Sequence, residues 1–169
     1  VMEGWVHLAQ RGFMSGRCML KNVLEIESPG VMEAWSARRT AAIMLFDFSS
    51  AFPSISREFM FMVLEWMGIP VCVINMIKAL YRNKVHVMAG KHGPVFAFIA
   101  FSGVRQGFPL SSTMFVLATG CLCCALVAEL AARGTVRFYA DDIAIVIKNI
   151  FSSFSKLGRM FDVFARISC

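Results

Sequence analysis

Two adjacent carboxylates, Asp141 and Asp142, stand between two apolar, β-prone runs at residues 136–140 and 143–148. Neighbouring side chains of a strand point to opposite faces, so both carboxylates can reach one site only if the chain turns sharply there. Because Asp tolerates left-handed turn geometry, the pattern predicts a hairpin with Asp141-Asp142 at its tip. Two like charges held this close require a cation, and Mg²⁺ prefers carboxylate oxygen. For the dipeptide alone, an ordinary exposed turn is the simpler interpretation.

A third carboxylate, Asp47, stands near the end of the apolar run at residues 41–48. A strand that is apolar on both faces is covered on both faces, so its single carboxylate is expected at the rim of a core. Such a strand beside the predicted hairpin would gather three carboxylates. Two-metal phosphoryl or nucleotidyl transfer requires an acidic cluster of this kind.

Three segments in order along the chain carry a family resemblance: DFSSAF at 47–52, GVRQGFPLS at 103–111 and YADD at 139–142. Together they resemble motifs A, B and C of reverse transcriptases. The GVRQG form is more similar to non-LTR (LINE-type) retrotransposon enzymes than to group II intron or retroviral ones. A fourth segment, QRGF at 10–13 with Gly16-Arg17, resembles that group's fingers segment. Four matches in the correct order are far more specific than any one of them.

The resemblance implies an RNA-directed DNA polymerase that extends a DNA primer on an RNA template with deoxynucleoside triphosphates. Asp47, Asp141 and Asp142 would be the catalytic residues and the ligands of two Mg²⁺ ions, with Mn²⁺ as a possible substitute. One ion lowers the pKa of the primer 3′-hydroxyl, and the other neutralises charge on the leaving pyrophosphate. No covalent intermediate is needed.

The resemblance also implies a set of substrate-binding residues: Phe48, Phe52, Gln106, Gly107, Tyr139, Arg105 and Arg17. Phe52 would lie against the sugar of the incoming nucleotide and exclude a 2′-hydroxyl, with core packing as the alternative. Gln106 and Gly107 would border the nucleotide, where glycine lets the backbone come close. Arg105 and Arg17 are candidates for phosphate or template contacts, and a solvated surface arginine is the alternative for each.

The sequence departs from the family pattern at Pro53, Phe108 and Ser112, where Asp, Cys and Pro are usual. None of these changes removes a metal ligand. Proline disfavours helical geometry in the residue before it, so Pro53 is expected to hold Phe52 in an extended conformation. The contact of Phe52 with the sugar is therefore what this departure affects.

The expected fold is α+β, one structural unit with a polymerase palm-like antiparallel sheet and helices packed on one face. Residues 1–40 would form partial fingers and connecting helices, and residues 41–169 the palm with motifs A, B and C. The chain has no initiator Met and stops before motif D, the primer grip and the thumb. It is therefore expected to be a catalytic-core fragment whose partners include the missing fingers and thumb of a longer polyprotein. The alternative is a truncated, inert polymerase fold that acts only as a nucleic-acid-binding or structural remnant.

Apolar spacing and turn residues predict the remaining elements. In the first part of the chain, helices are expected at 2–10, at 18–27 and before the Asp47 strand. Further along, one helix is expected through 59–67 and a second that ends near Tyr81. A long helix is expected to begin at 113 and stop at Gly134, and a last helix to begin near Ser152. A hairpin of 84–89 with 94–101 is expected between the helix that ends near Tyr81 and the helix that begins at 113.

Composition limits the class of protein. The chain is 57% hydrophobic with a mean hydropathy of +0.64, as expected for a core cut from a larger protein. Its net charge of +6 favours an anionic partner. The six cysteines show no paired C-x-x-C spacing and the three histidines no ligand spacing, so zinc is not expected. Free thiols and the lack of a targeting signal predict a reducing nuclear or cytoplasmic location. The apolar run 113–128 is shorter than the roughly twenty residues of a membrane span, so a buried helix is expected and no membrane partner.

Overall fold

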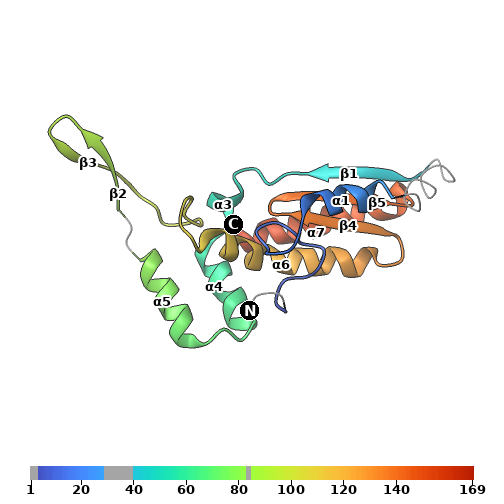
Figure 1. Cartoon of the computed structure of the whole chain (residues 1–169), viewed down its shortest axis with the longest axis horizontal. Coiled ribbons are helices and arrows are strands. Elements are labelled where there is room, and N and C mark those ends of the chain that lie inside the picture. Colours follow the sequence, from blue (N-terminus) through green and yellow to red (C-terminus); the bar gives the residue numbers. More distant parts are fainter. Residues whose placement is uncertain (1–3, 29–39, 83–84) are drawn as a thin grey trace.

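The computed structural model describes residues 4–28, 40–82 and 85–169 (Figure 1). In chain order its elements are α1 (Met19–Ile26), β1 (Ala42–Phe46), α3 (Ala51–Ser54), α4 (Arg57–Trp66), α5 (Val71–Tyr81), β2 (Val85–Gly90), β3 (Gly93–Ile99), α6 (Ser111–Leu130), β4 (Gly134–Tyr139), β5 (Asp142–Ile147) and α7 (Ile150–Ser168). The helix expected before the Asp47 strand falls within residues 29–39, outside the described ranges.

The central sheet is antiparallel, with the strand order β1-β5-β4. β5 is a run of β-branched and small residues, and its alternate side chains Ile143, Ile145 and Ile147 are almost fully buried. α6 and α7 cover this face, and the ring of Phe46 on β1 lies 4.7 Å from that of Phe161 on α7. The opposite face is more open, as the 78% exposure of Leu45 shows. The mixed fold with an antiparallel sheet is thus confirmed.

The helices begin and end at residues suited to these places. The Ser56 side chain accepts a hydrogen bond from the Phe59 backbone over 3.1 Å and so caps α4. Gly68, at φ 73°, follows the end of that helix as expected. The Asn149 side chain accepts from the backbone of Phe151 and Ser152 and caps α7, which begins two residues earlier than predicted.

The second sheet is the hairpin β2–β3, which extends away from the body beyond α5 (Figure 1). The predicted hairpin is confirmed, but Gly90 and Gly93 belong to the strands instead of the loop, and β3 ends at Ile99, two residues earlier than predicted. Residues 83 and 84 are not described. Large apolar side chains on both faces are exposed, Phe96 and Phe98 among them. Two isolated strands are marginally stable in water, so this hairpin depends on its attachment to the body.

The helix predicted at 2–10 is wrong over the described residues 4–10. This segment forms turns and then pairs with the edge of β4, where Gln10 makes a parallel bridge to Phe138. The Phe138 backbone N–H donates to Ala9 O over 2.8 Å, and the Arg11 N–H donates to Phe138 O over 2.9 Å. Pairing with a strand edge satisfies backbone groups that a helix would otherwise satisfy internally.

The long helix α6 differs from its prediction at both ends. It is 20 residues long, so the prediction that this apolar run is too short to span a membrane is wrong. By length and composition alone it could cross one, yet 56% of its apolar window is buried within the chain, as in the core helix of a folded domain. It stops at Leu130, and Gly134 opens β4 instead of ending the helix. A Cβ on Gly134 would lie 2.1 Å from Val146 O, so a side chain there would clash with the neighbouring strand.

Candidate active site

The β4–β5 hairpin turns as the sequence predicts, but one residue earlier. Tyr139 pairs with Asp142, so Ala140 and Asp141 form the turn and Asp142 is the first residue of β5. The left-handed residue is Ala140, at φ 57°, and the expectation that an aspartate would take this conformation is wrong. Asp141 is half-buried in the turn, whereas Asp142 is exposed at the strand end.

Asp47 lies at the same end of the sheet. It follows β1 directly, and the last pair of β1 with β5 is Phe46 with Ile143, so Asp47 is next to Asp142 in the register. Partial burial raises the pKa of Asp142, and the negative charges of Asp141 and then Asp47 raise it further. The structure therefore brings the three predicted carboxylates into one electrostatic cluster.

These carboxylates suit a hard divalent cation by chemistry. In the described part of the chain, none of the three makes an ion pair with Lys or Arg. A cation would relieve their mutual repulsion, and oxygen donors are what Mg²⁺ and Mn²⁺ prefer. Their geometry is open, because no three Asp, Glu, His or Cys side chains of the described residues already converge as ligands. Binding would require the carboxylates to move closer together.

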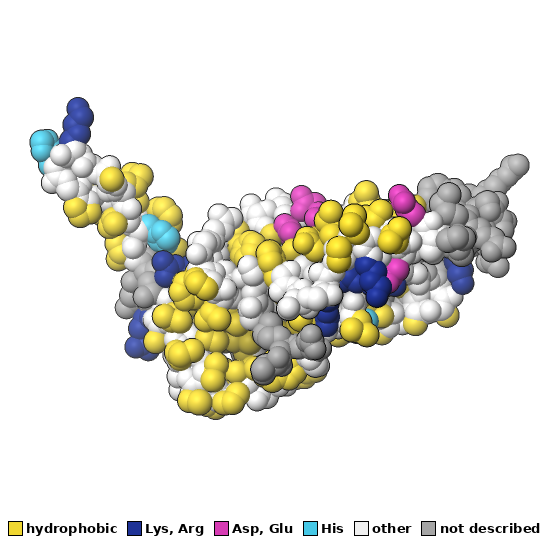
Figure 2. Space-filling view, in the orientation of Figure 1, with side chains coloured by type: hydrophobic (Ala, Val, Ile, Leu, Met, Phe, Trp, Pro, Cys, Tyr) yellow, Lys and Arg dark blue, Asp and Glu magenta, His cyan; other side chains and the backbone are white. Residues whose placement is uncertain are grey.

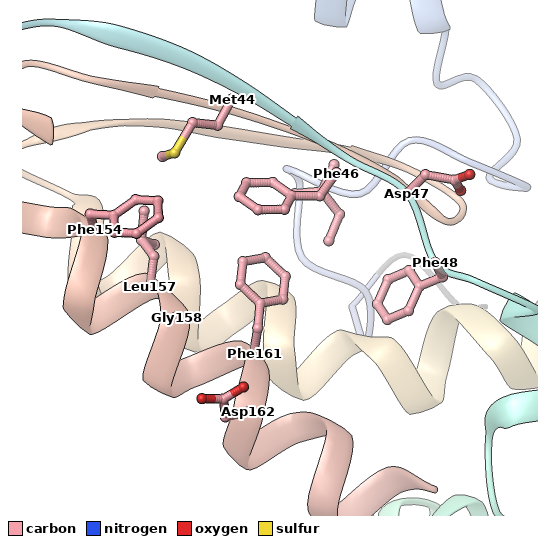
Figure 3. A pocket seen from close by; sticks show the side chains of 10 residues that line it. Met44, Phe46, Asp47, Phe48, Phe154, Leu157, Gly158, Phe161 and Asp162 are labelled. Atoms are coloured by element: carbon pink, nitrogen blue, oxygen red, sulfur yellow. The ribbon is translucent and has the colours of Figure 1, made fainter.

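An apolar pocket lies on the other side of this strand end, between β1 and α7 (Figure 3). Its volume is about 320 Å³, and its lining includes Phe46, Phe48 and Phe161. Figure 3 shows Asp47 pointing away from these rings. Asp47 is in its lining, whereas Asp141 and Asp142 are not, so the pocket borders the carboxylate cluster at Asp47 alone.

Phe48 and Phe52 both pack on α6. The Phe48 ring meets Phe115 and Phe164 edge to face, each at 6.0 Å between centroids. The Phe52 ring stacks on Phe115 at 5.0 Å and meets Phe13 at 6.4 Å. The structure thus describes core-type contacts for both rings, and their roles toward substrate stay predictions.

The effect predicted for Pro53 is wrong. Phe52 is not extended but lies in the short helix α3, which also contains Pro53. A proline in the first turn of a helix removes an N–H that has no helical partner, so it does not break this turn. Ser50, at φ 57°, precedes α3 and turns the chain after Asp47 into the helix.

The loop of residues 103–110 carries Gln106 and Gly107 on an exposed turn. Arg105 is half-buried, and its guanidinium lies 5.8 Å from the centre of the Phe108 ring. A cavity of about 560 Å³ lies between this loop and the β2–β3 hairpin, with Arg105 and Gln106 in its wall. No described hydrogen bond or ion pair joins this loop to the three carboxylates, so a shared nucleotide site stays a prediction.

Arg17 and Tyr139 have structural partners. Arg17 donates to the backbone oxygens of His7 and Gln10 over 2.9 and 2.6 Å, and so closes the loop before α1. Tyr139 is half-buried and pairs with Asp142 across the hairpin. The contacts of Arg17 and Tyr139 with substrate stay predictions.

Two buried polar side chains were not singled out by the sequence analysis. Arg57 is buried at the start of α4 and donates to three backbone oxygens, those of Gly103, Tyr81 and Ser102. Gln10 is buried beside the β4–β5 turn. In the sequence, Gln10 stands out only as a polar residue within the matched QRGF segment, and this was the one signal that could have indicated its role.

An ion-pair network joins α1 to the sheet. Figure 2 shows basic side chains beside an acidic one on this face of the body. Glu25 pairs with Arg11 over 2.7 Å and also with Arg137 of β4. The hydrogen bond from Arg11 holds the pKa of the Glu25 carboxyl below its ordinary value, opposed by partial burial and assisted by Arg137. Arg137 points to the face of the sheet opposite Val136 and Phe138, so α1 stands apart from the helices on the other face.

Comparison with known proteins gives two findings. A family model described as "Reverse transcriptase (RNA-dependent DNA polymerase)" matches residues 4–166. A solved structure of telomerase from Candida albicans, described as a complex with a TWJ fragment of telomeric RNA, is similar with a TM-score of 0.66 and 13% identity. The match covers 91% of this chain and 29% of that chain. At this identity the likeness shows a shared fold.

Proposed function

Because this chain belongs to the reverse transcriptase family, we propose that it forms the palm, with part of the fingers, of an RNA-directed DNA polymerase of the non-LTR retrotransposon type. The carboxylate cluster carries this proposal: Asp47, Asp141 and Asp142 share one end of the sheet, and the first two raise the pKa of the third. The chain spans 29% of the telomerase chain it resembles, so the substrates below are part of the proposal.

The proposed substrates are an RNA template, a DNA primer and deoxynucleoside triphosphates. Two bound Mg²⁺ ions would supply the acidity that activates the primer 3′-hydroxyl and the charge that offsets the pyrophosphate. The protein's part is to hold three carboxylates at one end of the sheet, where their mutual repulsion favours cation binding. Asp47 comes from β1, and Asp141 and Asp142 come from the β4–β5 hairpin, so sheet pairing sets their spacing.

The non-LTR assignment is proposed from sequence segments, and the location from the cysteines. The GVRQG and QRGF segments support the non-LTR type, whose templates would be the element's own RNA. The described cysteines are free, which supports a reducing nuclear or cytoplasmic location. The division into fingers before residue 41 and palm after it is proposed on the order of the motifs.

The test is primer extension by the protein that contains this chain, on an RNA template with a DNA primer and Mg²⁺. Asp141→Asn should lower the rate about a hundredfold or more, as expected when a group that stabilises transition-state charge is lost. Asp162→Asn is the matched control, since Asp162 is an exposed carboxylate on α7. Its rate should stay near that of the unmodified protein.

A second candidate is an inert polymerase fold that binds nucleic acid without chemistry. One observation favours this second candidate: the three described carboxylates do not converge as the ligands of a metal ion. Template-primer binding without any extension would support this candidate. Extension that survives Asp141→Asn would overturn the proposed metal site.

A further inference from the structure

The side-chain amide of Gln10 brackets the backbone of Ala140 on both sides. Its Oε1 accepts from the Ala140 N–H over 2.9 Å, and its Nε2 donates to the Ala140 carbonyl oxygen over 3.0 Å. The same Oε1 accepts from the Gly12 N–H over 2.8 Å. Gln10 is 1% exposed, so these bonds form out of water. One amide thus satisfies both polar backbone groups of a single turn residue.

Ala140 needs such support because its conformation is unfavourable. Its φ is 57°, in the left-handed region, where the Cβ of an L-residue crowds the backbone. Ala140 is also buried, so without Gln10 its N–H and C=O would lose their partners in a place that water does not reach. A residue stays in a strained backbone conformation only where several surrounding contacts hold it there.

The loop before α1 packs closely against this turn. A Cβ on Gly12 would lie 2.0 Å from Ala140 N, so only glycine lets the loop come this close. The Asn22 side chain of α1 donates to Phe138 O over 2.9 Å, one step farther from the turn. Gln10 is therefore the side chain of this loop that reaches the turn itself.

We propose that Gln10 is a positioning residue for the carboxylate cluster: it holds Ala140 in the left-handed conformation that presents Asp141 to a divalent cation. Ala140 directly precedes Asp141, so a change at Ala140 redirects the Asp141 side chain. Gln10 touches neither the cation nor the substrate. An amide is suited to this role because it offers a donor and an acceptor together, which alanine and carboxylate do not. The proposal rests on the proposed function in taking Asp141 as a metal ligand.

The experiment uses the whole chain and two readouts. The first is the one-bond Cα–Hα coupling of Ala140 by NMR, which distinguishes positive from negative φ without any metal. The second is the Kd for Mn²⁺, titrated by EPR at a temperature where every variant is folded by circular dichroism. The variants are Gln10→Ala and, should that variant fail to fold, Gln10→Asn, which keeps the amide but is too short to bracket Ala140. Asn22→Ala is the matched control, because it also removes a buried amide that bonds to the same hairpin.

Gln10→Ala should move the Ala140 coupling toward negative φ and raise the Kd for Mn²⁺ about tenfold or more, whereas Asn22→Ala should change neither. Adding Ala140→Gly to Gln10→Ala should recover much of the affinity, because glycine adopts positive φ without strain. An unchanged coupling in folded Gln10→Ala would overturn the proposal. So would an unchanged Kd, or an equal loss in Asn22→Ala. An unmodified chain that binds no Mn²⁺ would overturn the metal site and the positioning role together, and the coupling would still show whether Gln10 holds the turn.

Discussion

The guanidinium of Arg57 donates from Nε to the carbonyl oxygen of Gly103 over 3.2 Å, and so ties the start of α4 to the loop that carries Gln106. Two further bonds, to Tyr81 O over 3.1 Å and to Ser102 O over 3.3 Å, occupy the same side chain. Its guanidinium also lies 5.3 Å from the centre of the Tyr81 ring. Arg57 thus joins three segments of the chain.

Arg57→Met should lower the free energy of unfolding by about 2–4 kcal/mol, because three carbonyl oxygens lose a charged donor in a buried place. Urea denaturation of the whole chain measures this. Arg166→Met is the control, since Arg166 is exposed on α7 and should change stability by less than about 0.5 kcal/mol. Equal effects of the two substitutions would contradict the structural role of Arg57.

Gly103 and Gly107 separate the cost of backbone strain from that of crowding. Both have positive φ, at 83° and 77°, so alanine is strained at either. A Cβ on Gly103 would also lie 2.8 Å from Pro53 Cα, whereas a Cβ on Gly107 meets nothing within 4 Å. Gly107→Ala should cost about 1–2 kcal/mol of unfolding free energy, and Gly103→Ala about 1–3 kcal/mol more. Chemical denaturation of both variants tests this, and a smaller loss at Gly103 would be the contrary result.

Phe52 can be tested against Phe48, because the two rings share the neighbour Phe115. If Phe52 meets the sugar, Phe52→Val should raise the ratio of kcat/KM for ribonucleotides to that for deoxynucleotides in primer extension. Phe48→Val should lower stability by about 1–3 kcal/mol and leave that ratio unchanged. A ratio unaffected by Phe52→Val would assign Phe52 to the core alone.

The pKa of Asp142 should respond to its neighbours. Burial contributes most to the rise, followed by Asp141 and then by Asp47. Asp141→Asn should therefore lower the pKa of Asp142 more than Asp47→Asn does, in a carboxyl ¹³C NMR titration. The control substitution Asp162→Asn, on α7, should leave the pKa of Asp142 unchanged.

The raised pKa of Asp142 also sets how the free energy of unfolding depends on pH. A raised pKa means that the folded chain binds this proton more tightly than the unfolded chain, so stability is lost as the pH rises through the folded pKa of Asp142 and regained as the pH falls. In Asp141→Asn this dependence should weaken. Added Mg²⁺ should lower the pKa of Asp142, and no response to Mg²⁺ would argue against a cation site there.

The local patterns in the sequence were sufficient for much of the fold. The Phe59 to Met67 spacing gave α4, and the apolar runs around Asp141 gave the β4–β5 hairpin, since both depend on neighbours in the chain. The carboxylate cluster was also predictable, because carboxylates that interrupt or end apolar strands are concentrated at functional sites.

Three of the misses depend on contacts between distant residues, and the one at Phe52 depends on a nearby turn. Residues 4–10 have an apolar content that allows a helix, yet they pair with the edge of β4 at Phe138. The role of Gln10 exists only through Ala140, and that of Arg57 only through Gly103. Phe52 is helical because of the turn at Ser50 that precedes it, which the X-Pro rule does not consider.

The pairing of β1 with β5 has a consequence for the order of assembly. Ile43 lies opposite Val146, and most of the chain lies between them, whereas β4 and β5 are joined by a two-residue turn. Local hairpins form before contacts that must close a long loop. During synthesis, a nascent chain would already expose Gln10 and Asp47 while their partners at residues 140–142 are still unmade. The carboxylate cluster would therefore form late, when the hairpin docks between the two early segments.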